Sequence, residues 1–175
     1  MPNTPKTELE LDSFTRAYIE AALWSSTLEP FGECVSCGKD KVLCQFDADG
    51  DGPESTLCSD CGGDSSKNTC EPPADQNYSI DDLASETLVT MVEDCKQFQS
   101  DNAEWITDAH WLSGPREDYD VTEQAGHDFW LTRCNHGCGF WDGDWNDAAD
   151  EAMTVSSRKF GEVNLYVGDD GRVYA

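Results

Sequence analysis

The sequence predicts a mixed α+β fold, in which an antiparallel sheet formed by two hairpins packs with about three helices. Apolar residues recur at helical spacing in three segments, and two segments in the C-terminal half alternate strand-forming residues with turn residues. Residues 31–76 differ in composition, because they are rich in Gly, Ser, Asp, Pro and Cys and contain few large apolar side chains. We therefore predict one domain built from residues 1–30 and 77–175, interrupted by an inserted loop at 31–76.

The first predicted helix covers residues 11–26. Asp12 or Ser13 can cap its N-terminus, and apolar side chains on neighbouring turns give it one face suited to a core. Pro30 and Gly32 then end the helical pattern.

The inserted loop carries two C-x-x-C motifs, ECVSCGKD and LCSDCGGD, each followed by a glycine. Cysteines at this spacing are typical of a closed, structural zinc site, and the glycine lets the backbone turn toward the thiolates. Zinc binding, at about 10 to 16 kcal/mol, is large enough to fold a segment that has too few apolar residues for a core. We predict a zinc-ribbon-like loop, with disulfides or unliganded thiols as the alternatives. The predicted Zn²⁺ ligands are Cys34, Cys37, Cys58 and Cys61.

A second helix is predicted from the apolar residues that recur at helical spacing between residues 88 and 109. Ser79 and Asp82 match a capping box, and Ser85 offers a second cap. The helix either breaks near residues 100–102 or continues beyond them.

The first predicted hairpin follows a predicted loop at residues 112–125. Its strands are residues 128–133, which are rich in aromatic and β-branched side chains, and residues 139–141. Asn135-His136-Gly137 forms the predicted turn between them.

A third helix is predicted to begin at Asn146 or Asp147 and to run to Phe160. The second hairpin follows, with VNLYV and RVYA as strands and GDDG as the turn.

The chain is strongly acidic, with 36 acidic against 11 basic residues, a net charge of -25 and a pI near 4.1. This charge repels nucleic acid and anionic membranes and attracts basic surfaces. The sequence contains no apolar run of the roughly 20 residues needed to cross a bilayer and no signal-peptide pattern, so we expect a cytoplasmic protein. Adaptation to high salt and resemblance to a polyanion both account for the composition.

The segments GHDFWLTR, at residues 126–133, and HGCGFWD, at 136–142, resemble a group of small acidic conserved proteins of bacteriophages and other mobile elements, whose function is unknown. The similarity extends to LDSFTRAYIEAALWSST, YSIDDLASETLVTMVEDCKQFQ and FGEVNLYVGDDGRVY, and so covers most of the chain outside residues 31–76. It implies a phage-type protein in the host cytoplasm and no particular reaction. This chain departs from the group in its inserted loop, and in Cys134 and Cys138, which stand where the motif usually reads RNGHGAGFWD.

The same motif contains residue types used in general acid-base or phosphate chemistry, namely His127, Asp128, Arg133 and His136. An enzyme would pair a histidine with an acidic partner and use Arg133 to hold an anion. The chain contains no nucleophile elbow, phosphate-binding glycine-rich loop, HExxH or GxGxxG motif. The sequence therefore favours a structural or partner-binding role for the motif over catalysis.

Cys134 and Cys138 flank the predicted turn. They can remain free thiols, form a disulfide, or join His136 in a second metal site. The sequence leaves these alternatives open.

Binding to a basic protein surface is the function that the composition favours. The 25 net negative charges equal those of about a dozen base pairs of DNA, so we expect an inhibitor or DNA mimic directed at a host nucleic-acid-handling or defence enzyme. The alternatives are a zinc-stabilised structural or adaptor protein with a salt-adapted surface, and a small hydrolase or nucleotide-modifying enzyme that uses His127, Asp128 and His136. The candidate partner contacts are Asp47, Asp49, Asp51, Glu54, Asp118, Asp120, Glu123, Asp142, Asp144, Asp147 and Asp150.

Overall fold

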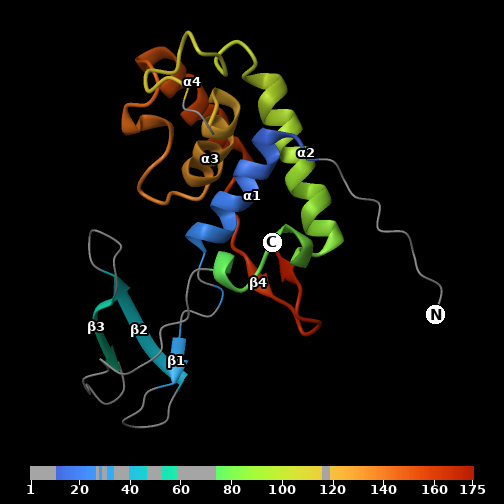
Figure 1. The fold of residues 1–175 in the computed structure, drawn as a ribbon, viewed down its shortest axis with the longest axis vertical. Helices are drawn as coiled ribbons and strands as arrows, with labels where there is room; N and C mark the ends of the chain where they lie inside the picture. Colours follow the sequence, from blue (N-terminus) through green and yellow to red (C-terminus); the bar gives the residue numbers. More distant parts are fainter. Residues whose placement is uncertain are drawn as a thin grey trace, which may run out of the picture.

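The computed structural model describes residues 11–26, 28, 31–33, 40–46, 53–58, 74–115 and 119–175. Four α-helices lie within these residues (Figure 1): α1 (Ser13–Ser25), α2 (Ser85–Asp101), α3 (Val121–Arg133) and α4 (Asp147–Ser157). Short 3-10 helices precede or follow them, namely η1 (Ala74–Gln76), η2 (Ile80–Asp82), η3 (Phe140–Asp142) and η4 (Arg158–Phe160). None of the helices in this described part of the chain is long and apolar enough to cross a membrane.

Helix α1 forms as the sequence predicted. The carboxylate of Asp12 caps it by accepting a hydrogen bond of 2.7 Å from the backbone N–H of Thr15. The helix is buried on most of its surface, apart from the stripe formed by Arg16, Glu20 and Trp24, and it packs closely against α3. The approach is close because α3 has a glycine at position 126, where a Cβ would lie 2.1 Å from the carbonyl oxygen of Phe14.

Helix α2 ends at Asp101, so the prediction of a break near residues 100–102 is confirmed. The amide of Asn102 holds this end by donating to the carbonyl of Phe98 and to the hydroxyl of Ser156 on α4. The predicted capping box of Ser79 and Asp82 is present, but it caps η2 and not α2.

The prediction of a hairpin at residues 128–141 is wrong, because residues 121–133 form helix α3 and residues 140–142 form η3. Helix α3 is buried on nearly all sides from Gln124 to Arg133, so it lacks the one-sided apolar stripe that reveals a helix in a sequence. A capping box formed by Asp120 and Glu123 marks the start of α3. This start lies within residues 112–125, which the sequence predicted to be a loop.

The predicted turn at residues 135–137 does exist, but it ends a helix. Asn135 adopts φ of 54° and Gly137 adopts φ of 82°, a left-handed conformation that suits asparagine and glycine.

The core is aromatic and lies where α1, α2 and α3 meet. Phe98 on α2 stacks on Phe129 of α3 with ring centroids 4.1 Å apart, and Tyr18 on α1 lies 5.1 Å from the same ring. Phe14 and Phe140 complete the cluster and are fully buried. These contacts place the motif's helix at the centre of the domain.

The predicted third helix and final hairpin are present, but α4 ends at Ser157, and the residues up to Phe160 form the 3-10 helix η4. Asn146 caps α4, and β4 (Tyr166–Val167) pairs antiparallel with β5 (Val173–Tyr174). The carbonyl of Val173 accepts a 2.8 Å hydrogen bond from the N–H of Ala84, which joins the hairpin to the start of α2. The described part of this domain is therefore mixed α+β, but its helices pack around one another and not on a broad sheet.

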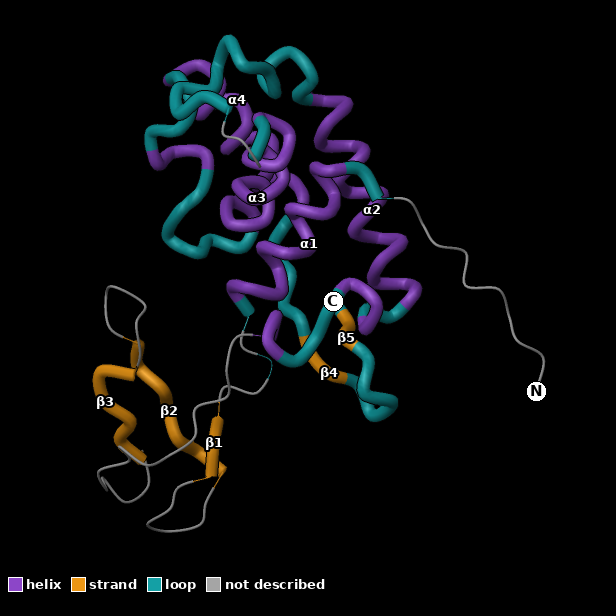
Figure 2. Tube along the Cα trace, in the orientation of Figure 1, coloured by secondary structure: helices purple, strands orange, loops and turns teal. Residues whose placement is uncertain are grey.

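The segment predicted as an insertion has its own sheet (Figure 2). Strands β1 (Phe31–Glu33), β2 (Asp40–Phe46) and β3 (Pro53–Cys58) pair antiparallel in that order, and their backbone alone is described. The two ends of the segment meet at the helical domain, where Ala74 donates a 3.0 Å hydrogen bond to the carbonyl of Ser26.

Candidate functional site

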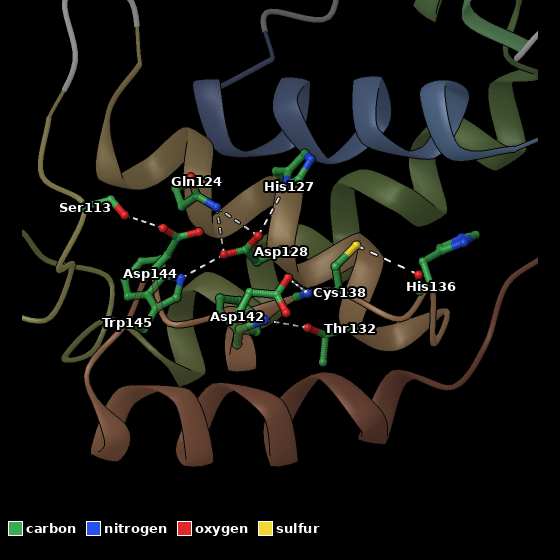
Figure 3. Close-up of polar contacts among 12 residues, drawn as sticks. Ser113, Gln124, His127, Asp128, Thr132, His136, Cys138, Asp142, Asp144 and Trp145 are labelled. Atoms are coloured by element: carbon green, nitrogen blue, oxygen red, sulfur yellow. Dashed lines mark hydrogen bonds and ion pairs between the residues drawn. The ribbon is translucent and has the colours of Figure 1, made fainter. Parts of the chain in front are cut away.

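Asp128 lies at the centre of the motif and is 3% exposed. Its carboxylate accepts hydrogen bonds from the side-chain amide of Gln124 at 2.9 Å and from the indole N–H of Trp145 at 2.8 Å (Figure 3). Nδ1 of His127 lies 3.1 Å from its Oδ1. These contacts satisfy a buried charge that would otherwise be costly, and they tie α3 to the start of α4.

Arg133 is also committed to structural contacts. Its guanidinium donates to the hydroxyl of Tyr18 at 2.7 Å, to the carboxylate of Asp94 at 2.8 Å, and to the carbonyls of Phe160 and Gly161 at 2.9 Å. Its side chain is 3% exposed. Burial raises the pKa of Tyr18 well above its usual value, so the phenol stays protonated. Arg133 therefore joins α1, α2 and the segment after α4.

His127 differs from these two residues, because it reaches the surface. With Nδ1 on Asp128, the other ring nitrogen is the one that can meet a ligand, and Figure 3 shows the ring turned toward α1. The ring lies 6.1 Å from the ring of Trp24. Both residues line a groove of about 790 Å³ that runs along α1.

His136 lies at a second, smaller cavity of about 160 Å³. Its Nε2 is 3.5 Å from the hydroxyl of Ser25, and its ring stacks on Trp130 at 6.3 Å. Burial lowers the pKa of His136 below its usual value. Glu162 lines the same cavity, and neither Ser25 nor Glu162 is marked in the sequence by a motif.

The thiols of Cys134 and Cys138 are free and point to different carbonyl groups. Cys134 Sγ lies 3.5 Å from the carbonyl of Val163, and Cys138 Sγ lies 3.9 Å from that of His136. Burial raises the pKa of both thiols. Within the described residues, no three His, Cys, Asp or Glu side chains are grouped to hold a metal, so the second metal site with Cys134, His136 and Cys138 stays a prediction.

The predicted zinc ligands lie largely outside the described residues. Cys34, Cys37 and Cys61 are not described, and Cys58 is described through its backbone alone, as the last residue of β3.

The acidic candidates divide in the same way. Asp47, Asp49, Asp51 and Asp118 lie outside the described residues, and Glu54 is described through its backbone in β3. The others lie at or near helix ends. Asp120 and Glu123 cap α3, Asp142 accepts from the N–H of Gly139, Asp144 accepts from the hydroxyl of Ser113, and Asp147 and Asp150 lie in the first turn of α4.

The loop after α2 lies beside the start of α4, which the sequence did not reveal. Trp111 forms a β-bridge with Trp145, and the N–H of Asn146 donates to the carbonyl of His110 at 2.9 Å. Exposed Asp108, two residues before His110 on this loop, therefore adds to the acidic residues near the start of α4.

Comparison with known proteins gives no relative from which a function can be transferred. No family model, no curated protein and no solved structure matches the chain.

Proposed function

We propose that this protein acts by binding a basic surface of another protein, as an inhibitor or DNA mimic of a host nucleic-acid-handling or defence enzyme. One observation carries the proposal: among the described side chains, Asp128 is the only buried carboxylate. The other described acidic groups are exposed or half-buried, in a chain of net charge -25. Such a surface attracts cationic partners over long range.

The residues around the start of α4 form the best-supported contact surface, which we call the α4 acidic surface: Asp108, Asp144, Asp147 and Asp150. They come from two segments held together by the bridge between Trp111 and Trp145. Carboxylates fixed on paired segments lose less conformational entropy on binding than those on a free tail. This geometry supports a preformed contact surface.

The motif supports binding for a second reason. Arg133 and Asp128, which an enzyme would need for holding an anion or moving a proton, already have protein partners on several sides. A hydrolase or nucleotide-modifying enzyme remains the second candidate, because His127 is oriented by a buried carboxylate and lines the large groove.

We propose further that the inserted segment binds one structural Zn²⁺ through Cys34, Cys37, Cys58 and Cys61. The strand register supports this proposal: Glu33 pairs with Asp40, and Val42 pairs with Cys58. The strand ends that adjoin the two C-x-x-C motifs therefore lie at one end of the sheet, as a shared metal would require. Zinc would stabilise the segment and supply no reaction, because four thiolates leave no open coordination position.

Affinity capture tests the proposed function. The folded protein, immobilised through a tag, is expected to retain a nucleic-acid-handling enzyme from host lysate at about 0.15 M salt and to release it as salt rises. Replacing the four aspartates of the α4 acidic surface with Asn should reduce capture more than neutralising Glu86, Glu93, Glu162 and Asp169. Both variants lose four negative charges, so the second is a control for net charge. Capture of no such enzyme, or capture indifferent to salt, contradicts the proposal. A protein that folds only in molar salt would favour the salt-adapted adaptor instead.

A further inference from the structure

The groove along α1 has a volume of about 790 Å³. Its walls come from α1, from the segment at residues 74–82 and from α3. This volume lies within the range of ligand-binding sites in proteins.

Small residues open the floor of the groove. Ala17 and Ala21 lie four residues apart, so their methyl groups share one face of α1. Tyr78, Ile80 and Tyr119 line the groove beside them. The lining therefore offers an apolar and aromatic surface to an occupant.

Trp24 stands at one end of this surface and is 54% exposed, an unusual state for the largest apolar side chain. Its ring faces that of His127 at 6.1 Å. An exposed indole binds either an apolar side chain or, over its face, a cation.

The rim of the groove is acidic. Among the described side chains that line it, Glu20, Asp75 and Asp81 are acidic, and Arg16 is the only lysine or arginine. This excess of negative charge disfavours phosphate-containing ligands and favours a cationic one.

The length of the groove favours a peptide over a small molecule. Its lining residues on α1 run from Arg16 to Trp24, about 12 Å at 1.5 Å per residue, and Leu11 extends it by more than a turn. An extended chain advances about 3.3 Å per residue, so the groove accommodates about six residues.

We propose that this groove docks an extended segment of the partner protein in which apolar side chains alternate with lysine or arginine. The apolar side chains contact Ala17, Ala21 and Tyr78, and the basic ones face Glu20 and Asp75. The inference deepens the proposed function and rests on it, since it assigns a specific docking site to the basic partner.

Fluorescence anisotropy with labelled peptides of about ten residues tests the inference. The probe alternates leucine with lysine; one control peptide replaces lysine with glutamate, and the other replaces leucine with glycine. The Leu/Lys peptide is expected to bind at about 0.15 M salt, and both control peptides are expected to bind at least about tenfold more weakly.

Matched variants locate the binding. Trp24→Ala should weaken Leu/Lys peptide binding about tenfold and Glu20→Lys about threefold. Val89→Ala and Glu93→Lys, at exposed positions of α2 outside the groove, should leave it unchanged.

Three results overturn the inference: no peptide binding, equal binding of the Leu/Lys and Gly/Lys peptides, or equal effects of groove and α2 variants. Self-association of the protein that Trp24→Ala abolishes also overturns it, because the occupant is then a second copy. The proposed function survives each of these results if affinity capture still yields a basic partner, and fails separately if capture yields none.

Discussion

The carbonyl oxygen of Phe14 lies where a side chain at position 126 would begin. A Cβ on Gly126 would meet that oxygen at 2.1 Å, and backbone atoms cannot move aside as a flexible side chain can. The crossing of α1 and α3, and with it the whole aromatic core, therefore depends on the absence of one carbon atom.

Gly126→Ala should destabilise the domain by about 3 kcal/mol or prevent folding, because the helices must separate to admit the methyl group. Urea unfolding followed by far-UV circular dichroism measures the effect. Ala148→Gly, at an exposed position of α4, is the control and should cost about 1 kcal/mol. A Gly126→Ala protein as stable as wild type would show that the helices do not cross as described.

Arg133→Met should cost about 3 to 5 kcal/mol, because it keeps the volume but leaves Asp94, Tyr18 and the carbonyls of Phe160 and Gly161 without their donor. Lys96→Met, on the exposed face of α2, is the matched control and should change stability by less than about 0.5 kcal/mol. If the two variants unfold at similar urea concentrations, Arg133 is not the structural link described above.

Stability should depend on pH through the cap of α1. Burial alone would raise the pKa of Asp12, but its hydrogen bonds with Thr15 and Gln99 and the nearby charge of Lys96 together leave the pKa below the usual value of 3.8. A carboxyl group with a lowered folded-state pKa stabilises the protein above its unfolded pKa and loses this contribution as pH falls through the folded one.

Asp12→Ala should therefore cost about 1 kcal/mol at pH 7, and the difference from wild type should shrink as pH falls below about 4. Urea unfolding of both proteins between pH 7 and the acid limit of folding measures this difference. A constant difference at every pH would mean that the charge of the cap contributes nothing.

The sequence predicted the elements whose boundaries have local signals. Asp12, Asn146 and the GDDG turn mark α1, α4 and the final hairpin with side chains that bond nearby backbone or suit a turn. Helix α3 was misread because its boundary signal, Asp120 with Glu123, lay in a segment interpreted as a loop, and because a helix buried on nearly all sides shows no periodic pattern.

The candidate site was predictable in its residue types and not in their roles. His127, Asp128, Arg133 and His136 are close in sequence, but their partners Tyr18, Asp94, Ser25 and Glu162 come from other segments. Long-range contacts of this kind decide whether an arginine binds a ligand or stabilises the fold. The spacing of residues within one motif contains no information about such contacts.

Metal content should be about one zinc per chain after metal-replete purification, measured by inductively coupled plasma mass spectrometry. Replacing Cys34 and Cys37 with serine should abolish zinc binding, whereas Cys134→Ser with Cys138→Ser should leave it unchanged. Zinc retained by the first variant, or absent from the wild-type protein, contradicts the proposed zinc site.

Competition with DNA tests the central claim most directly. The captured partner is bound to the labelled protein, and a DNA duplex of about 12 base pairs is added, which carries a charge similar to the protein's -25. If the protein occupies a nucleic-acid groove as a DNA mimic, the duplex displaces it, and the protein in turn reduces the partner's affinity for DNA. A ternary complex in which both ligands keep their full affinities would contradict the claim.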